Sequence, residues 1–370
     1  MDFYTNVVQW GNFLLVRGVD NNQRVNFRLK YKPTLFVPVM KQTDWKTLDG
    51  KSVTPYQFDC IKYAKDFLLK YESQPHLVHG LNRFAYTYIS DTFPQKVNWN
   101  IDKILIMTID IEVQCENGFP NPESAIEPLL SITVKNQQSK KIIVWGIQPY
   151  KNTREDVTYI RCPNEHDLIM EFMSFWTKNY PDVITGWNTD FFDIPYLANR
   201  IKQVCGEDKM RELSPWKNVS SKQIYSMGRN HLMYDIMGVS QYDYLQLYQK
   251  FTYIRQESYK LDYIASVELG EKKDENPYET FREWYENDFQ SFIDYNIQDV
   301  EIVDKLEDKM GLIDLALTMA YEGKVNYSDV FGQVKYWDIL IYNFLRKRKI
   351  VIPQKSCLLY TSDAADDLVG

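Results

Sequence analysis

Five side chains in the middle of this 370-residue chain could together support metal-assisted chemistry. They are Asp110 and Glu112, then Asp193, and finally Tyr295 and Asp299. Carboxylate oxygens are the ligands that Mg²⁺ and Mn²⁺ prefer, and these ions keep several bound waters. A tyrosine hydroxyl beside a metal-bound carboxylate can orient an attacking water or help to deprotonate it. The set is therefore a candidate site for divalent metal ions.

The first pair lies in the apolar run KILIMTIDIEV, which predicts a β-strand. At positions i and i+2 of a strand, Asp110 and Glu112 point to one face, while Ile109, Ile111 and Val113 point to the other. Neighbouring carboxylates repel each other unless a cation lies between them. Taken alone, however, such a pair is usually the solvent-facing side of an ordinary strand.

Each of the other candidates could also have an ordinary structural role when it is considered alone. Asp193 follows a predicted buried strand that ends at Gly186-Trp187-Asn188. There it could reach the carboxyl edge of a sheet, where α/β sites commonly lie, or it could simply favour a helix N-terminus. Tyr295 and Asp299 are four residues apart and share one face of a predicted helix, as many surface pairs do.

The elements that must hold these residues change in character along the chain. Residues 1–104 are β-rich, with strands in NFLLVRGVD, RVNFRLKYKP and TLFVPVM and a helix at about 56–72. From Lys103 onward, strands come first and then alternate with helices. The predicted fold class is α/β (α+β), with helices packed on a mixed sheet.

Several helices can be placed within the second region. Asn164 is the predicted N-cap of a helix that runs through HDLIMEFMSFWTKNY, and FDIPYLANRIKQV follows as another. Further helices are expected at 258–269 and about 287–310. Residues 217–242 are polar, with Gly and Asn at their centre, and predict a protruding hairpin or loop.

Composition excludes several classes of protein. Hydrophobic and charged fractions of 44% and 25% are ordinary for a globular protein, and we find neither a membrane-length apolar run nor a signal-like start, so we expect an intracellular, non-membrane protein. The five cysteines are scattered, so neither zinc nor a disulfide framework is indicated. The net charge of −7 is uneven: residues 1–104 carry 14 basic and 9 acidic side chains, which permits local phosphate contacts. Both regions could equally be solvated surface.

The segments around the five candidates resemble the three exonuclease motifs of family B DNA polymerases. They are Asp110-Ile-Glu112 followed by Gly118-Phe119-Pro120, the block GWN…FDIPY around Asp193, and YNIQDV from Tyr295. The sequences around these motifs most resemble those of replicative polymerases of T-even-type phages. Further matching segments are YKPTLF at 31–36, YKLDYI at 259–264 and Trp337-Asp338. The resemblance runs from about residue 1 to Pro353.

The resemblance implies a ribonuclease-H-like 3′→5′ exonuclease domain. In that family, Asp110, Glu112, Asp193 and Asp299 would bind two divalent ions, Mg²⁺ or Mn²⁺, that clamp an in-line phosphoryl displacement. Asp110 would be shared by both ions, with Glu112 and Asp299 on the water-activating one and Asp193 mainly on the other. Tyr295 would align the water.

Two further residues resemble positions that contact nucleic acid. Phe119 looks like the aromatic residue that stacks on a terminal base, and the alternative is a turn aromatic that covers the sheet edge. Asn188 resembles a residue that contacts the 3′-terminal nucleotide, and the alternative is a turn at a strand end. The 217–242 hairpin resembles the element that helps to part a primer end from its template.

The resemblance also predicts a domain organisation. Residues 1–104 would be an N-terminal β-rich α+β domain and 105–310 the exonuclease domain, while 311–353 would pack back on the N-terminal domain and lead toward a polymerase palm that is absent. Residues 354–370 have no match in the family. We expect this tail to be artefactual and the natural protein to be longer.

The sequence therefore predicts the proofreading exonuclease portion of a replicative DNA polymerase. Its substrate would be single-stranded or primer-template DNA, and the parent protein would act with a sliding clamp and replisome proteins in the cytoplasm, that of the host cell if a phage encodes it. A stand-alone exonuclease and a non-catalytic nucleic-acid-binding remnant are the competing hypotheses.

Overall fold

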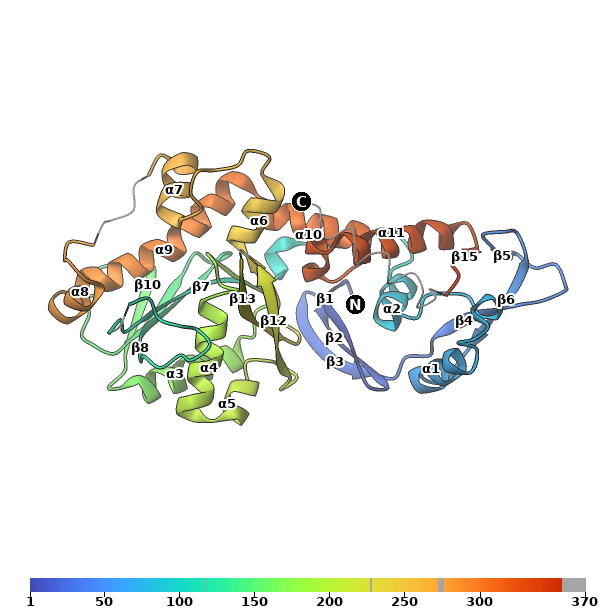
Figure 1. Cartoon of the computed structure of the whole chain (residues 1–370), viewed down its shortest axis with the longest axis horizontal. Helices are drawn as coiled ribbons and strands as arrows, with labels where there is room; N and C mark the ends of the chain where they lie inside the picture. The colour runs from blue at the N-terminus through green and yellow to red at the C-terminus, as the bar shows by residue number, and fades with distance from the viewer. Residues whose placement is uncertain (117, 227, 272–275, 355–370) are drawn as a thin grey trace. The chain divides into compact units, whose positions relative to one another are not determined.

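The computed structural model shows a chain that divides into two compact units (Figure 1). The first unit comprises Met1–Trp99 and the residues from Thr318 onward, and the second comprises Asn100–Leu317. Within the described residues, no helix is long and apolar enough to cross a membrane. The predicted artefactual tail lies outside the described residues, apart from Gln354. The residues that the structure describes are 1–116, 118–226, 228–271 and 276–354.

The first unit is built on two small sheets and is β-rich, as expected. One sheet is antiparallel with the strand order β1-β2-β3, and the other has the order β15-β5-β6-β4. Three helices accompany them: α1 (Ile61–Lys70), α2 (Phe84–Thr92) and α11 (Gln333–Lys347). The strands are β1 (Phe3–Trp10), β2 (Phe13–Asp20), β3 (Gln23–Leu29), β4 (Thr34–Pro38), β5 (Trp45–Thr47), β6 (Ser52–Gln57) and β15 (Ile350–Val351).

The helix predicted at about 56–72 begins later in the chain than expected. Helix α1 begins at Ile61, after an extended Cys60, and strand β6 occupies the chain as far as Gln57. There Pro55 lies opposite Phe36 of β4. Tyr56 and Gln57, where the helix was expected to begin, instead pair with Leu35 and Thr34 of β4, so strand pairing prevails before α1.

The chain returns to the first unit at its far end. The Tyr4 hydroxyl donates to the Val325 carbonyl oxygen at 2.8 Å. The Asn326 side chain accepts from the Val7 N–H and donates to the Val7 carbonyl, both at 2.8 Å. Strand β15 also pairs in parallel with β5. Residues 325, 326 and 350–351 are thus an integral part of the fold of residues 1–99.

The second unit is built on a mixed six-stranded sheet, which confirms the predicted fold class. The strand order is β10-β9-β8-β7-β11-β14. Neighbours β7–β8 and β8–β9 are antiparallel, whereas β7–β11, β11–β14 and β9–β10 are parallel. The strands are β7 (Ile106–Val113), β8 (Leu129–Asn136), β9 (Ile142–Gly146), β10 (Val157–Arg161), β11 (Val183–Gly186) and β14 (Ser240–Asp243).

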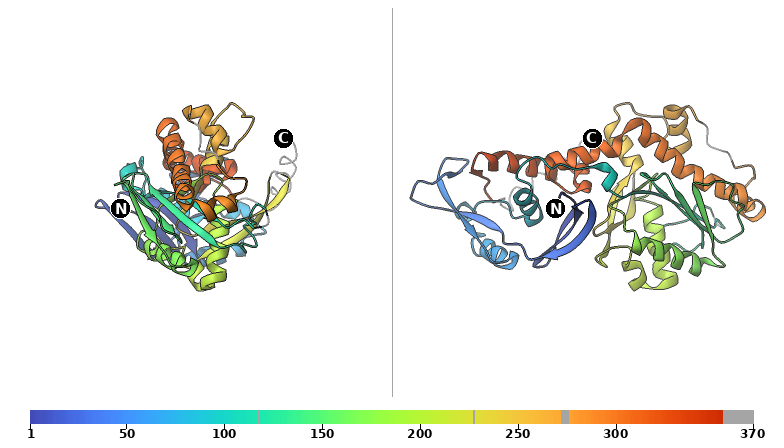
Figure 2. Two further views of the ribbon diagram at one scale, coloured as in Figure 1. Left: turned by 90° about the vertical axis from the view of Figure 1, so that its left-hand side faces the viewer. Right: turned by 180° about the vertical axis from the view of Figure 1, so that it is seen from behind.

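Helices cover both faces of this sheet (Figure 2). On one face, α3 and α4 bury a core that includes Trp145, Phe172 and Trp176. On the other face, α8 and α9 bury a second core around Trp284 and Phe292. The Asn164 side chain accepts from the Asp167 N–H, which confirms the predicted N-cap of α3. The helices of this unit are α3 (Glu165–Lys178), α4 (Asp193–Cys205), α5 (Glu207–Arg211), α6 (Tyr244–Phe251), α7 (Leu261–Leu269), α8 (Phe281–Asn287) and α9 (Phe289–Met310), with α10 (Leu312–Gly323) crossing into the first unit.

The protruding element predicted at 217–242 is shorter than expected. Strands β12 (Val219–Ser226) and β13 (Arg229–Ile236) pair as an antiparallel hairpin, with residue 227 outside the described residues. The last part of the predicted segment is core instead, because residues 240–243 form β14 of the main sheet and Tyr242 is fully buried.

A buried ion pair anchors helix α9 to strand β8. The Lys135 ammonium lies 2.8 Å from Oδ2 of Asp304, and Lys140 lies 2.8 Å from Oδ1 of the same carboxylate. Lys135 and Asp304 are 7% and 3% exposed. Both carboxylate oxygens therefore have a cationic partner, which offsets the loss of hydration. Asp304 follows Asp299 by five residues, so the pair also fixes the helix that carries the candidate site.

We expect Asp304→Ala to lower the free energy of unfolding by about 3–5 kcal/mol, because it leaves the buried Lys135 ammonium without its carboxylate. The control Glu286→Ala removes one partner of the exposed Arg282–Glu286 pair and should lower it by no more than about 1 kcal/mol. Urea unfolding followed by tryptophan fluorescence measures both changes. Equal losses in the two variants would contradict the anchoring role.

Candidate active site

Asp110 and Glu112 project from β7 on the side covered by α9. Both side chains are half-buried. The neighbouring Ile109 and Ile111 point to the other face of the sheet and are buried in the core beneath α3 and α4. Across the antiparallel ladder, Asp110 lies opposite Thr133 of β8 and Glu112 lies opposite Ser131. The alternation predicted from the sequence is therefore present in the strand.

Asp299 of α9 meets this pair and forms an acidic cluster with it. One carboxylate oxygen from each of Asp110, Glu112 and Asp299 lies within 4.8 Å of the other two. Oxygen ligands of Mg²⁺ at ~2.1 Å lie at most ~4.2 Å apart, so small side-chain rotations would bring these oxygens to that geometry. Carboxylates this close repel each other unless a cation lies between them. The donor set thus fits a hard divalent cation.

Asp193 lies beside this cluster but is not one of its three members. It is the first residue of α4, and its Oδ1 accepts the N–H of Ile111 at 3.1 Å. The pairing of β11 with β7 ends at Thr185. Farther along β7, the Asp193 carboxylate takes the place of a neighbouring strand as the partner of the Ile111 N–H. Burial raises the pKa of Asp193, and the Ile111 N–H opposes that shift while the charge of Asp299 adds to it. A cation at the cluster would favour the ionised form.

Tyr295 lies one helical turn before Asp299 on α9 and is half-buried. Its ring packs edge-on against Trp284 of α8, with ring centroids 4.9 Å apart, and lies 6.2 Å from Phe281. Helix α8, which the sequence analysis did not predict, therefore fixes the ring from one side.

The loop between β11 and α4 approaches β7 closely. A Cβ at Gly186 would lie 2.4 Å from the Ile109 carbonyl oxygen, so only glycine fits there. Asn188 follows with a left-handed backbone (φ +64°), which asparagine tolerates better than most residues. Its N–H donates to Oδ1 of Asp243 at 3.0 Å. This geometry sets Asn188 and Asp193 beside the acidic strand.

Two buried carboxyl groups fix that loop: Asp243 at the end of β14, and Asp190 within the loop itself. Asp243 also accepts the N–H groups of Asp190 and Leu245, and Asp190 accepts from the Gln246 amide at 2.8 Å. The other Asp190 oxygen has no hydrogen-bond partner in the described structure. Burial raises the pKa of both groups, and the negative charge of Asp243 raises that of Asp190 further. Protonation of Asp190 relieves the repulsion between the two.

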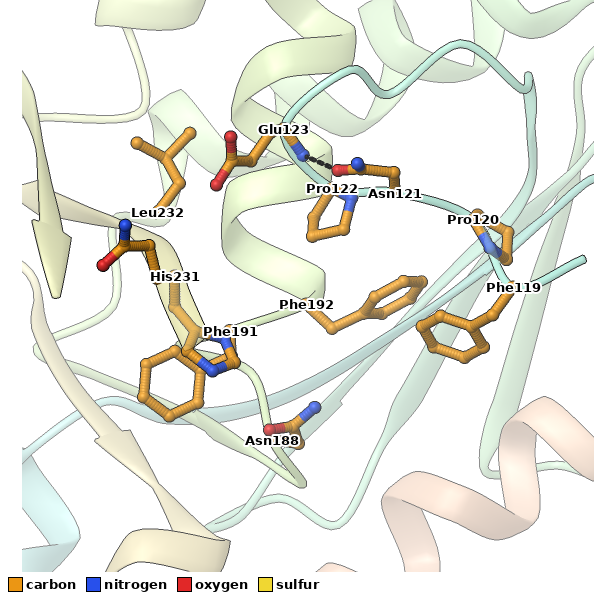
Figure 3. Close-up of a pocket in the computed structure, with 11 residues that line it drawn as sticks. Phe119, Pro120, Asn121, Pro122, Glu123, Asn188, Phe191, Phe192, His231 and Leu232 are labelled. Carbon is orange, nitrogen blue, oxygen red and sulfur yellow. Dashed lines mark hydrogen bonds between the residues drawn. The ribbon is translucent and has the colours of Figure 1, made fainter. Parts of the chain in front are cut away.

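Phe119 and Asn188 both line a cleft of about 470 Å³ next to the start of α4 (Figure 3). The Phe119 side chain is 83% exposed, and its ring centroid lies 5.1 Å from that of Phe192. On the hairpin side, Phe191 packs against His231 of β13 with centroids 4.4 Å apart. An open cleft with exposed aromatic faces and an amide can hold a flat, partly polar group.

The structure adds residues that the sequence analysis did not single out as functional. Phe192 and His231 complete the cleft, and Asp243 holds the Asn188 loop. Asn296 donates to Asp110, a contact that the sequence analysis did not predict. A fully buried asparagine within the apolar stripe of α9 was a signal that could have identified it, whereas the aromatic and hairpin residues had no comparable signal.

Comparisons with known proteins bear on this geometry. The family described as "DNA polymerase family B, exonuclease domain" matches residues 82–264, a span that includes Asp110, Glu112 and Asp193. The mixed sheet with helices on both faces is accordingly of the ribonuclease-H-like class that the sequence analysis expected.

Individual relatives agree with the family match. The DNA-directed DNA polymerase of Escherichia phage RB69 is 33% identical over 95% of this chain and 42% of its own length. That of Enterobacteria phage T4 is 32% identical over 96% of this chain and 42% of its own length. The DNA polymerase delta catalytic subunit of Candida albicans is 29% identical over 49% of this chain and 18% of its own length. The chain thus spans less than half the length of these relatives.

Asp190 should make the stability of this protein fall as pH rises. Its folded-state pKa is raised, so above its ordinary value of about 4 the folded protein keeps a proton that the unfolded chain has released. Stability is therefore lost as pH rises toward the folded-state pKa. Asp190→Asn should flatten this dependence and stabilise the protein at pH 8 by about 1 kcal/mol or more.

The measurement is urea unfolding at pH 5 and pH 8. Asp59, which is 84% exposed, supplies the control Asp59→Asn, which should leave the pH dependence unchanged. An Asp190→Asn variant with the pH profile of the wild type would refute the assignment.

Proposed function

Since the chain belongs to DNA polymerase family B, we propose that it is the proofreading 3′→5′ exonuclease portion of a replicative DNA polymerase. The observation that carries the proposal is the meeting of Asp110, Glu112 and Asp299, from a strand and a helix far apart in sequence, within 4.8 Å. A metal ion and a substrate can reach these carboxylates, because two of the three residues are only half-buried.

The carboxylates would hold two divalent ions, Mg²⁺ or Mn²⁺. When bound, such ions activate a water and stabilise the leaving 3′ oxygen of an in-line displacement. Asp110 would be the shared ligand, and its carboxylate lies within 4.8 Å of those of both Glu112 and Asp299. Glu112 and Asp299 would complete the water-activating side. Asp193 would serve the second ion once it ionises, while keeping its bond to the Ile111 N–H.

Tyr295 would orient the attacking water. Its ring is held by Trp284, and it lies on the same helix as Asp299, so its hydroxyl has a restricted range of positions. The proton of the water would pass to a neighbouring oxygen of the site and then to solvent. The residues of the chain thus bind, orient and accept charge, and no covalent intermediate with the protein is required.

The aromatic cleft would hold the single-stranded 3′ end. Base stacking on an aromatic side chain is tolerant of sequence, which suits an enzyme that must accept any terminal nucleotide. Phe119 is exposed enough to stack, with Phe192 behind it, and Asn188 offers an amide at the same cleft. The β12–β13 hairpin, which contributes His231 to the cleft, would help to guide a frayed end of primer-template DNA.

The wider role follows from the relatives. In the parent polymerase, residues 1–104 would form the N-terminal domain and 105–310 the exonuclease domain, while 311–353 would pack on the N-terminal domain and lead toward the palm. A sliding clamp and replisome proteins would be its partners. The phage relatives support action in the cytoplasm of a host cell. The non-catalytic remnant considered above is distinguished from this proposal by the first experiment below.

Asp110→Ala/Glu112→Ala should abolish digestion of 5′-labelled single-stranded DNA in Mg²⁺, with a loss of about 100-fold or more, because two metal ligands are removed. The wild type should give a ladder of products shortened from the 3′ end. The matched control Asp66→Ala/Glu72→Ala removes two exposed carboxylates and should leave the ladder intact. Tight DNA binding by the wild type without any cleavage would instead support the remnant.

Phe119→Ala should raise KM for single-stranded DNA by about 5- to 100-fold, because one base loses an aromatic stacking partner. The value of kcat should change less, since Phe119 does not belong to the acidic cluster. Tyr63→Ala, which removes an aromatic side chain on α1 that is also exposed (57%), is the control and should leave KM unchanged. An unaltered KM in Phe119→Ala would mean that Phe119 only covers the sheet edge.

A further inference from the structure

We propose that Asn296 is a positioning residue that sets the carboxylate of Asp110 for metal binding. The inference rests on the proposed function, in which Asp110 is a metal ligand. It concerns a side chain that lies between the strand and helix halves of the acidic cluster.

Asn296 connects three elements at one point. It projects from α9, is fully buried, and donates from Nδ2 to Oδ2 of Asp110 at 2.5 Å. Its Oδ1 accepts from the Ser131 hydroxyl at 3.0 Å and from the Thr133 hydroxyl. Ser131 and Thr133 are the β8 residues directly opposite Glu112 and Asp110. The amide therefore contacts three side chains of the two-strand ladder that carries the ligands: Asp110, Ser131 and Thr133.

The orientation of the amide is determined by its partners. An ionised carboxylate can only accept hydrogen bonds, so the NH₂ group must face Asp110. A flipped amide would place its oxygen against the carboxylate and its NH₂ group against the two hydroxyls. The two hydroxyls donate to Oδ1 and hold the amide in the productive orientation. Thr133 and Ser131 thus act on Asp110 through Asn296.

This bond fixes both the rotamer of Asp110 and its distance from α9. Asn296 precedes Asp299 by three residues on the same helix, so one side chain ties the ligand of the strand to the segment that carries the ligand of the helix. The Lys135–Asp304 pair attaches the same helix to the same face of β8 farther along. Two attachment points prevent α9 from sliding or rotating along β8.

A general stabilising role predicts a different behaviour from a positioning role. Asn343 of α11 is a suitable comparison, because it is also buried and its amide also links two elements: its Oδ1 accepts from Ser90 at 2.7 Å, and its Nδ2 donates to the Ile339 carbonyl. In the described structure, the hydrogen-bond partners of this amide are the Ser90 hydroxyl and the Gly323 and Ile339 carbonyls, and none of them is a carboxylate. Loss of either amide should lower stability, but only Asn296 should alter metal binding.

The experiment measures Mn²⁺ affinity by calorimetric titration, with the thermal unfolding midpoint of each variant as a second readout. Asn296→Ala should bind Mn²⁺ about 10- to 100-fold more weakly than the wild type, as is typical when a hydrogen-bond partner of a metal ligand is removed. Ser131→Ala/Thr133→Val keeps the amide but frees its orientation and should give a smaller loss. Asn343→Ala should lose stability with unchanged Mn²⁺ affinity.

The outcomes separate this inference from the proposed function. If Asp110→Ala binds Mn²⁺ as well as the wild type does, the metal site itself is wrong. If Asp110→Ala loses binding while Asn296→Ala retains wild-type affinity, the positioning role is refuted. Should Asn296→Ala fail to fold, the Ser131→Ala/Thr133→Val variant decides, because wild-type affinity in that variant would also refute the role.

Discussion

Mutual repulsion among carboxylates is the constraint on which this structure depends. Asp110, Glu112 and Asp299 must stay within 4.8 Å of each other although their charges push them apart. A strand alone cannot achieve this, because the third carboxylate comes from a helix almost two hundred residues later. The framework therefore has to hold α9 on β8 and β7 against that repulsion, which it does with the buried Lys135–Asp304 pair and the amide of Asn296.

Buried carboxylates serve a second, different purpose a few residues away. Asp243 accepts N–H groups from the loop that follows β11, and Asp193 accepts the N–H of Ile111 where β11 no longer pairs. These acids replace missing backbone partners and so satisfy groups that would otherwise be buried without a hydrogen bond. The same residue type thus satisfies backbone groups beside the candidate site and also forms its acidic cluster.

The sequence predicts much of this arrangement because strand alternation and helical spacing are local properties. The pairing of Asp110 with Glu112, the N-cap Asn164 and the mixed sheet all follow from such patterns. Strand β14 was missed because its four residues sit in a polar stretch, and their burial depends on pairing with β11. The start of α1 was placed too early because the pairing of β6 with β4 is a tertiary contact. The contact between Asn296 and Asp110 spans 186 residues, and no local pattern records it.

The return of the chain to strand β5 has a consequence for how the protein is made. The second unit is continuous in sequence, so all of its strands have left the ribosome once residue 317 has emerged. The first unit is discontinuous, because early residues bond to late ones. Tyr4 bonds to residue 325, Val7 to residue 326, and Lys46 pairs with residue 350. The nuclease fold can therefore form during synthesis before the domain that begins the chain is complete. The unit whose residues are translated first is therefore the one whose residues are completed last.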